Sequence, residues 1–216
     1  MKTLGEKTPM HRLLDPYQPV PNPLLVVISG PSGVGKDTVL RRMKERGYPF
    51  HFVITTTDRA PRPGEVHGRD YFFVPTQEFK RMIETGELLE HAVVYGQYKG
   101  ISKAQVREAL DSGQDVIMRI DVQGAATIRR LAPEAVFIFL TCESEEALVS
   151  RLKARGTETE ATLQARLAVI SQEFQHLPEF DYLVVNHSNR LDETVETIAA
   201  IIRAEKCRVR QRHIAL

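Results

Sequence analysis

Residues 24–40 read Leu-Leu-Val-Val-Ile-Ser-Gly-Pro-Ser-Gly-Val-Gly-Lys-Asp-Thr-Val-Leu. The apolar run 24–28 predicts a buried strand, and the pattern from Thr38 onward predicts a helix. Between them, residues 30–36 satisfy the Gly-x-x-x-x-Gly-Lys pattern of a phosphate-binding loop. Its glycines let backbone N–H groups crowd around a polyphosphate, the helix directs its positive end at the same anion, and Lys36 reaches the terminal phosphates. The stretch therefore predicts nucleotide chemistry.

The position after the lysine departs from the usual motif. A Ser or Thr that ligates magnesium normally stands there, whereas this chain has Asp37, with Thr38 one place later. Asp37 could itself face the ion, because hard cations prefer oxygen ligands, or Thr38 could supply the hydroxyl. The sequence leaves both open. A glycine-rich turn without a ligand is the alternative for the whole loop, and the flanking strand and helix argue against it.

Composition sets the outer limits. A chain of 216 residues with 42% hydrophobic residues can bury the core of one sizeable domain with inserted lobes. The net charge of +1 argues against a dedicated nucleic-acid surface. Cys142 and Cys207 lie far apart and give no sign of a disulfide framework or a zinc site. No apolar run approaches the ~20 residues that span a membrane.

The first 22 residues combine charged side chains with prolines and lack the apolar stretch of a secretory signal. We expect them to form a flexible N-terminal tail. We expect a cytoplasmic protein that is a monomer or a homodimer and has no nucleic-acid or membrane partner.

Apolar runs that predict strands alternate with helical patterns over most of the chain. The strands are expected at residues 24–29, 115–120, 135–140 and 182–186. The helices are expected at residues 37–46, 102–112, 125–131, 144–155, 160–175 and 192–208. This alternation predicts an α/β fold with a parallel sheet covered on both faces, a three-layer core.

Residues 50–100 break that rhythm. Short runs at 50–56, 71–74 and 90–94 are separated by prolines and glycines, and a helix is expected at 76–85 with Thr76 as its N-cap. This pattern predicts a small, mostly β lobe inserted in the core. Within it, Arg59 and Arg62 surround a proline, with Tyr71 beyond, and two guanidiniums plus a phenol could clamp a phosphate monoester. An exposed basic loop is the alternative.

Six segments in order resemble the guanylate kinases, a family of P-loop nucleoside monophosphate kinases. They are the phosphate-binding loop 28–36, the arginine segment 59–65 with 68–71, residues 90–92 with 95–96, the Ile-Asp-Val-Gln-Gly-Ala stretch 120–125, Arg151 with Arg155, and residues 185–186. The variants Gly-Lys-Asp and Tyr-Lys-Gly-Ile-Ser-Lys (98–103) look most like the plant organellar branch.

The resemblance implies Mg²⁺-dependent phosphoryl transfer from ATP to GMP or dGMP, in purine nucleotide metabolism and GMP recycling. It implies a P-loop core at 23–54, 104–144 and 167–216, a GMP-binding lobe at 55–103, and a helical lid at 145–166. The catalytic residues would be Lys36, Arg151, Arg155 and Arg166. ATP would bind Gly30, Pro31, Ser32, Gly33, Val34, Gly35, Lys36, Asp37, Thr38 and Asn186. GMP would bind Thr55, Arg59, Arg62, Glu65, Tyr71, Glu90, Lys99, Ser102 and Asp121. Magnesium would lie near Asp37, Thr38 and Asp121.

Two positions depart from the family pattern. Lys99 replaces a tyrosine that helps to hold the GMP phosphate, and Ile101 replaces a hydroxyl residue that donates to guanine O6, with Ser102 adjacent. Two other functions stay open on the sequence: a non-catalytic guanylate-kinase-like module that binds partner proteins, and a different small-molecule kinase on the same scaffold, such as a ribosyl-phosphate kinase. The intact loop argues against the first, and Glu90 with the arginine pair argues against the second.

Overall fold

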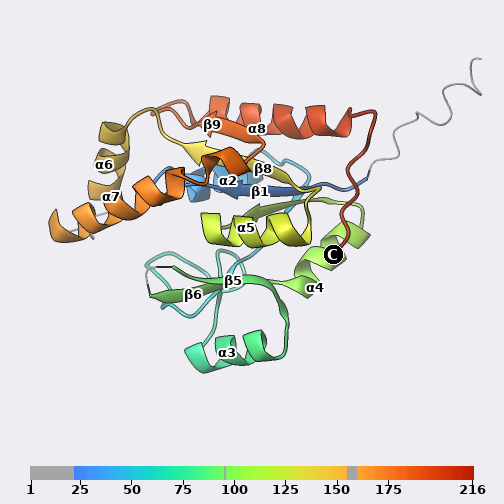
Figure 1. Cartoon of the computed structure of the whole chain (residues 1–216), viewed down its shortest axis with the longest axis horizontal. Coiled ribbons are helices and arrows are strands. Elements are labelled where there is room, and N and C mark those ends of the chain that lie inside the picture. Colours follow the sequence, from blue (N-terminus) through green and yellow to red (C-terminus); the bar gives the residue numbers. More distant parts are fainter. Residues whose placement is uncertain (1–21, 95, 155–159) are drawn as a thin grey trace, which may run out of the picture.

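The computed structural model describes residues 22–94, 96–154 and 160–216 (Figure 1). Its core is a parallel sheet of five strands in the order β2-β7-β1-β8-β9. The strands are β1 (Leu25–Ser29), β2 (Phe50–Phe52), β7 (Asp115–Arg119), β8 (Val136–Thr141) and β9 (Tyr182–Val185). β2 and β7 lie on one side of β1, and β8 and β9 lie on the other. The strand order therefore changes direction at β1, and α/β folds bind ligands at such a point.

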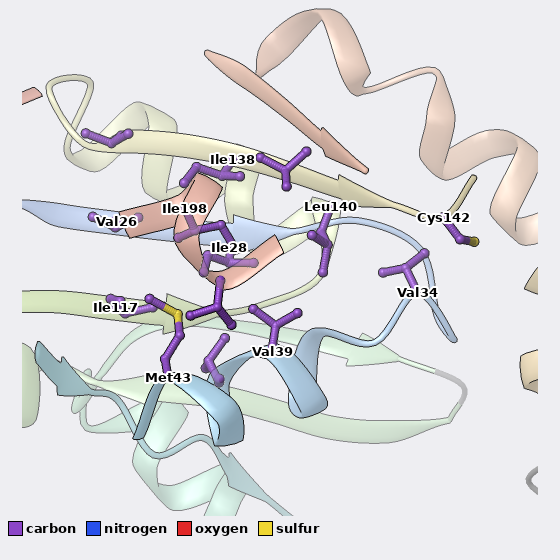
Figure 2. Close-up of a cluster of buried hydrophobic side chains, with 14 of the residues drawn as sticks. Val26, Ile28, Val34, Val39, Met43, Ile117, Ile138, Leu140, Cys142 and Ile198 are labelled. Atoms are coloured by element: carbon purple, nitrogen blue, oxygen red, sulfur yellow. The ribbon is translucent and has the colours of Figure 1, made fainter. Parts of the chain in front are cut away.

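Helices cover both faces of this sheet, so both faces of β1 are buried. Val26 and Ile28 face one cluster with side chains of α2 (Lys36–Glu45) and α8 (Leu191–Lys206), shown in Figure 2. Leu25 and Val27 face a second cluster with α4 (Lys103–Asp111) and α5 (Val122–Leu131). The alternation along one strand thus produces the three layers, and the predicted α/β fold class is confirmed.

The lobe is a second sheet that lies below the core in Figure 1. Its four strands run in the order β4-β3-β6-β5, and α3 (Thr76–Glu84) packs on β5. They are β3 (Thr56–Thr57), β4 (Phe72–Phe73), β5 (Leu88–Val94) and β6 (Gln97–Ser102). All four lie within the range 55–103 expected for the GMP-binding lobe.

Two expectations for this region were wrong, and one strand was not predicted. The run 50–56 is not one continuous strand, because β2 pairs with β7 in the core sheet and β3 pairs with β6 in the lobe. Strand β6 was not expected. Thr76 does not cap α3; Pro75 is the N-cap residue, and the Thr76 hydroxyl donates to Asp58 instead, at 2.9 Å.

Two helices stand at the carboxyl end of the core sheet, at the left of Figure 1: α6 (Glu145–Lys153) and α7 (Glu160–Phe174). Ser144 caps α6 by accepting from the Ala147 N–H at 3.2 Å. A short 3₁₀ helix, η2 (Leu177–Glu179), leads from α7 to β9. The predicted catalytic residue Arg155 lies outside the described residues. None of the described helices is long and apolar enough to cross a membrane.

The C-terminal segment, residues 208–216, returns to the amino end of the sheet. Arg212 donates two hydrogen bonds, of 2.8 and 3.0 Å, to the buried carboxylate of Glu205. It also donates to the carbonyl of Ala135, just before β8. Ile214 and Leu216 pack on the second core cluster. This segment therefore closes the end of the sheet opposite to the phosphate-binding loop.

Candidate nucleotide-binding site

The glycines of the phosphate-binding loop meet requirements that other residues would not. Gly30 has φ 130°, and a Cβ there would lie 2.1 Å from the carbonyl oxygen of Leu140. Gly35 has φ 98°, and a Cβ there would lie 2.5 Å from the Asn186 amide nitrogen. The loop can therefore pass closely over the carboxyl end of the sheet only without side chains at these positions.

Lys36, the first residue of α2, folds back into its own loop. Its ammonium group donates to the carbonyl of Gly30 and, at 2.9 Å, to that of Pro31. Burial lowers the Lys36 pKa to about 8, although the carboxylates of Glu173 and Asp37 act to raise it. A phosphate that enters the loop would offer this ammonium group an anionic partner in place of two neutral carbonyls.

The side chains of Asn186 and Arg151 hold the phosphate-binding loop through hydrogen bonds to its backbone. The Asn186 amide donates to the Val34 carbonyl at 2.8 Å, and its own oxygen accepts from Thr194 at 3.1 Å. Arg151 donates to the same Val34 carbonyl at 3.2 Å and to the Asn186 carbonyl at 2.8 Å. Asn186, expected to bind ATP, and Arg151, expected to be catalytic, thus both hold the loop in shape in this structure.

One cavity of about 270 Å³ joins the loop to the lobe at the carboxyl ends of β1 and β7. The expected site residues that line it are Gly30, Pro31, Ser32, Gly33, Gly35, Lys36, Asp37, Thr38, Thr55, Arg59, Arg62, Tyr71, Glu90, Lys99, Asp121 and Arg166. Of the expected residues that the structure describes, Val34, Glu65, Ser102, Arg151 and Asn186 are not in this lining. The fold therefore brings the predicted donor and acceptor residues to one space.

Arg59 is held in a fixed orientation at the lobe side of the cavity. Two bonds of 2.6 Å join its guanidinium to the Glu65 carboxylate, which also accepts from the Arg62 N–H at 2.7 Å. The Arg59 side chain is 6% exposed and stacks 4.7 Å from the ring centroid of Tyr71. Glu65 thus positions Arg59 rather than lining the cavity itself.

Glu90, on β5, presents a buried carboxyl group to the same cavity. The residue is 3% exposed, and its Oε2 atom has no hydrogen-bond partner among the described residues. Burial, and then the charge of Asp121, raise the Glu90 pKa to about 8. The hydroxyl of Thr55 is also buried and has no hydrogen-bond partner within the part of the chain that the structure describes. Such unpaired polar atoms are costly unless a ligand completes them.

Residues 22–205 match the family model described as guanylate kinase. The chain belongs to the guanylate kinase family. It is 51% identical over 201 residues to guanylate kinase 2, chloroplastic/mitochondrial, of Oryza sativa subsp. japonica. The aligned region covers 93% of this chain and 70% of the relative. It is 45% identical to a guanylate kinase of Caldanaerobacter subterraneus subsp. tengcongensis, over 86% of this chain and 89% of the relative.

A solved guanylate kinase from Anaplasma phagocytophilum has a similar fold, with a TM-score of 0.70 and 31% sequence identity over 90% of this chain and 92% of that one. The resemblance drawn from the six sequence segments is therefore confirmed. Guanylate kinases transfer a phosphoryl group from ATP to GMP, and in this chain one cavity is lined by both the phosphate-binding loop and the lobe.

Sequence reasoning missed two charged residues of the cavity. Arg119, the last residue of β7, is 15% exposed and bonds the Asp37 carboxylate beside the loop. Glu173, from α7, lines the cavity with its Oε2 atom buried and without a partner among the described residues. A signal for Arg119 existed, because it lies two residues before Asp121 at the carboxyl end of a predicted strand. No such signal existed for Glu173.

Ser102, the residue expected to supply the hydroxyl lost at Ile101, lies outside the cavity lining. Ile101 is fully buried in the second core cluster, and Ser102 is the N-cap residue of α4, outside the cavity lining. Thr55, whose hydroxyl is unpaired in the described ranges, does line the cavity. The contact expected of Ser102 can therefore fall to Thr55.

The oxygen atoms suited to a magnesium ion are few. No three His, Cys, Asp or Glu side chains within the described ranges are grouped as a metal cage. Thr38 and Asp121 line the cavity together, whereas the Asp37 carboxylate is bonded to Arg119. One or two protein oxygens fit a magnesium ion that takes its remaining ligands from nucleotide phosphates and water.

Proposed function

We propose that this chain is an ATP:GMP phosphotransferase that binds ATP on the phosphate-binding loop and GMP in the lobe. The observation that carries the proposal is that the phosphate-binding loop and the lobe line the same cavity, with Lys36 on the loop side and Glu90 on the lobe side. Family membership supports the same reaction.

Glu90 and Thr55 would select guanine. An ionised Glu90 can accept from N1–H and the exocyclic amine of guanine, and the Thr55 hydroxyl can donate to O6. Adenine has no N1–H donor, so AMP would leave a buried acceptor unpaired, at a cost of about 1–3 kcal/mol. The same pairing accommodates dGMP, since it does not involve the 2′-hydroxyl.

The GMP phosphate would lie among Arg59, Arg62, Tyr71 and Lys99, all of which line the cavity. One of its oxygens attacks the γ-phosphorus of ATP in line, and the bond from that phosphorus to the β–γ bridging oxygen breaks to release ADP. Lys36 and Arg166 stabilise the charge on the transferring group. Arg151 acts through Val34 by holding the loop. Arg155, outside the described residues, stays a predicted lid residue.

Magnesium would be held by the ATP phosphates with Thr38 and Asp121, and it would neutralise phosphate charge there.

We also propose that the chain is divided into a core, a GMP-binding lobe and a lid. We propose that it acts in purine nucleotide metabolism, in the cytoplasm, as a monomer or a homodimer. Two sheets and a lid around one cavity favour closure when both nucleotides bind. Small-angle scattering should then show compaction.

An ADP-release assay across GMP, dGMP, AMP, CMP and UMP tests the function. We expect turnover with GMP and dGMP only. No turnover with any acceptor would overturn the kinase assignment, and faster turnover of AMP than of GMP would overturn the choice of base. Lys36→Met should abolish turnover and leave GMP binding intact, whereas Glu90→Ala should relax the choice of base.

A further inference from the structure

Arg119 connects the two halves of the cavity. On the loop side its guanidinium bonds the carboxylate of Asp37, and on the lobe side it stacks 4.7 Å from the ring centroid of Tyr71. The Arg119 side chain is 15% exposed, whereas that of Asp37 is 62% exposed. The guanidinium therefore lies inside the cavity and its carboxylate partner lies at the edge.

Arg119 belongs to a group of cations around Tyr71. Arg59 also stacks 4.7 Å from the Tyr71 ring, so the two guanidinium carbons lie no farther apart than twice that distance. Lys99 lines the same space, and burial and the charge of Arg119 lower its pKa. Like charges gathered in a partly buried space are unfavourable without an anion among them.

The carboxylates nearby do not satisfy this group equally. Glu65 holds Arg59 through two short bonds, as described above. Among the described residues, Arg119 bonds a single carboxylate, that of Asp37, and the exposure of Asp37 allows water to compete for this bond. An Arg presents several N–H donors, so Arg119 can keep Asp37 and still donate to a second anion.

We propose that Arg119 binds the phosphate of the acceptor nucleotide together with Arg59, while its bond to Asp37 neutralises the carboxylate that stands beside the phosphate-binding loop. This inference rests on the proposed function. It assigns Arg119 to the acceptor site, and it makes Asp37 a partner of that arginine.

A simpler function would be neutralisation of Asp37 alone. The two functions differ when both charges are removed. If Arg119 serves only Asp37, the double variant Asp37→Asn/Arg119→Gln should bind GMP as the wild type does. If Arg119 contacts the GMP phosphate, the double variant should bind GMP as weakly as Arg119→Gln alone.

Calorimetric titration of the unmodified chain and these variants with GMP, without ATP, measures this difference. We expect Arg119→Gln and the double variant to lose about 10- to 100-fold in GMP affinity, as for a hydrogen bond to a charged group. Arg119→Lys should lose less because it keeps the charge. Arg107→Gln, on the exposed surface of α4, is the matched control and should bind as the wild type.

Guanosine, which lacks the phosphate, provides the second probe through competition with GMP. Its affinity should change less than about twofold in Arg119→Gln, and this result also shows that the variant is folded. An equal loss of guanosine and GMP affinity in Arg119→Gln overturns the inference. Wild-type GMP affinity in Arg119→Gln or in the double variant also overturns it. Failure of the proposed function is distinct, because it would appear as absence of GMP turnover in the unmodified chain.

Discussion

Gly124 leaves the space that the carboxylate of Glu90 fills: a Cβ added at Gly124 would lie 2.6 Å from the Glu90 Oε2 atom. The two residues come from different parts of the fold, since Gly124 lies in the first turn of α5 and Glu90 lies on β5 of the lobe sheet. The position of the Glu90 carboxylate, which we propose to contact guanine, thus depends on the absence of a side chain at Gly124.

Gly124→Ala should therefore displace Glu90 and raise the KM for GMP by about tenfold, the cost of one misplaced charged hydrogen bond. The folded state should keep its melting temperature or gain slightly, because alanine favours a helix over glycine by up to about 1 kcal/mol. Steady-state kinetics and thermal melts separate the two effects. Gln123→Ala, exposed on the same turn, is the control; an unchanged KM for Gly124→Ala would contradict the geometry.

Binding of GMP should release a proton at pH 7. Burial raises the pKa of Glu90 to about 8, so the free protein holds this group mainly in its neutral form, whereas guanine requires the carboxylate. GMP affinity should accordingly rise from pH 7 to about 8.5. Calorimetry in buffers of different ionisation enthalpy counts the proton. Glu90→Gln should abolish the release, and a release that persists in this variant would assign it to another group.

Binding of ATP should have the opposite proton linkage. Burial lowers the Lys36 pKa to about 8, so a share of the free protein carries a neutral amine at pH 8.5. A phosphate beside the amine favours its charged form, so ATP binding at this pH should take up a proton and weaken as pH rises. The same calorimetric protocol measures it. Lys36→Met removes the group, and uptake equal to that of the wild type would refute the assignment.

Glu65→Gln should raise the KM for GMP by about 5- to 20-fold and leave the KM for ATP unchanged. The amide can keep one of the two bonds to Arg59 and loses the charge that holds the guanidinium in place. Glu78→Gln is the matched control, because Glu78 also makes two bonds to an arginine, Arg81, on the exposed surface of α3. Equal effects in both variants would rule out a positioning function for Glu65.

The sequence predicted what local patterns determine. Strand β1, the glycine-rich loop and α2 follow one another within a short stretch, so apolar periodicity and the motif locate all three. It did not predict that β2 and β3 belong to different sheets, since the run 50–56 looks uniform and only pairing with distant strands divides it. Pairing partners are a property of the whole fold.

The same limit applies to the site. Motif resemblance selected Asn186 and Arg151 as nucleotide contacts, but it could not show that both donate to the Val34 carbonyl. Arg119 was not among the predicted site residues, and only the fold brings it against Asp37 and Tyr71. Side chains that act across elements need the tertiary structure to be recognised.

The C-terminal segment also offers an engineering route. Near the amino end of β1, the Asn22 amide lies 3.4 Å from Nδ1 of His213, so the residue before β1 and the C-terminal segment are neighbours. A short linker could join them, and the chain could be reopened at the exposed turn around Gly113 after α4. Such a circular permutant would carry its new ends away from the nucleotide cavity, and these ends could attach dyes or tethers that report on closure.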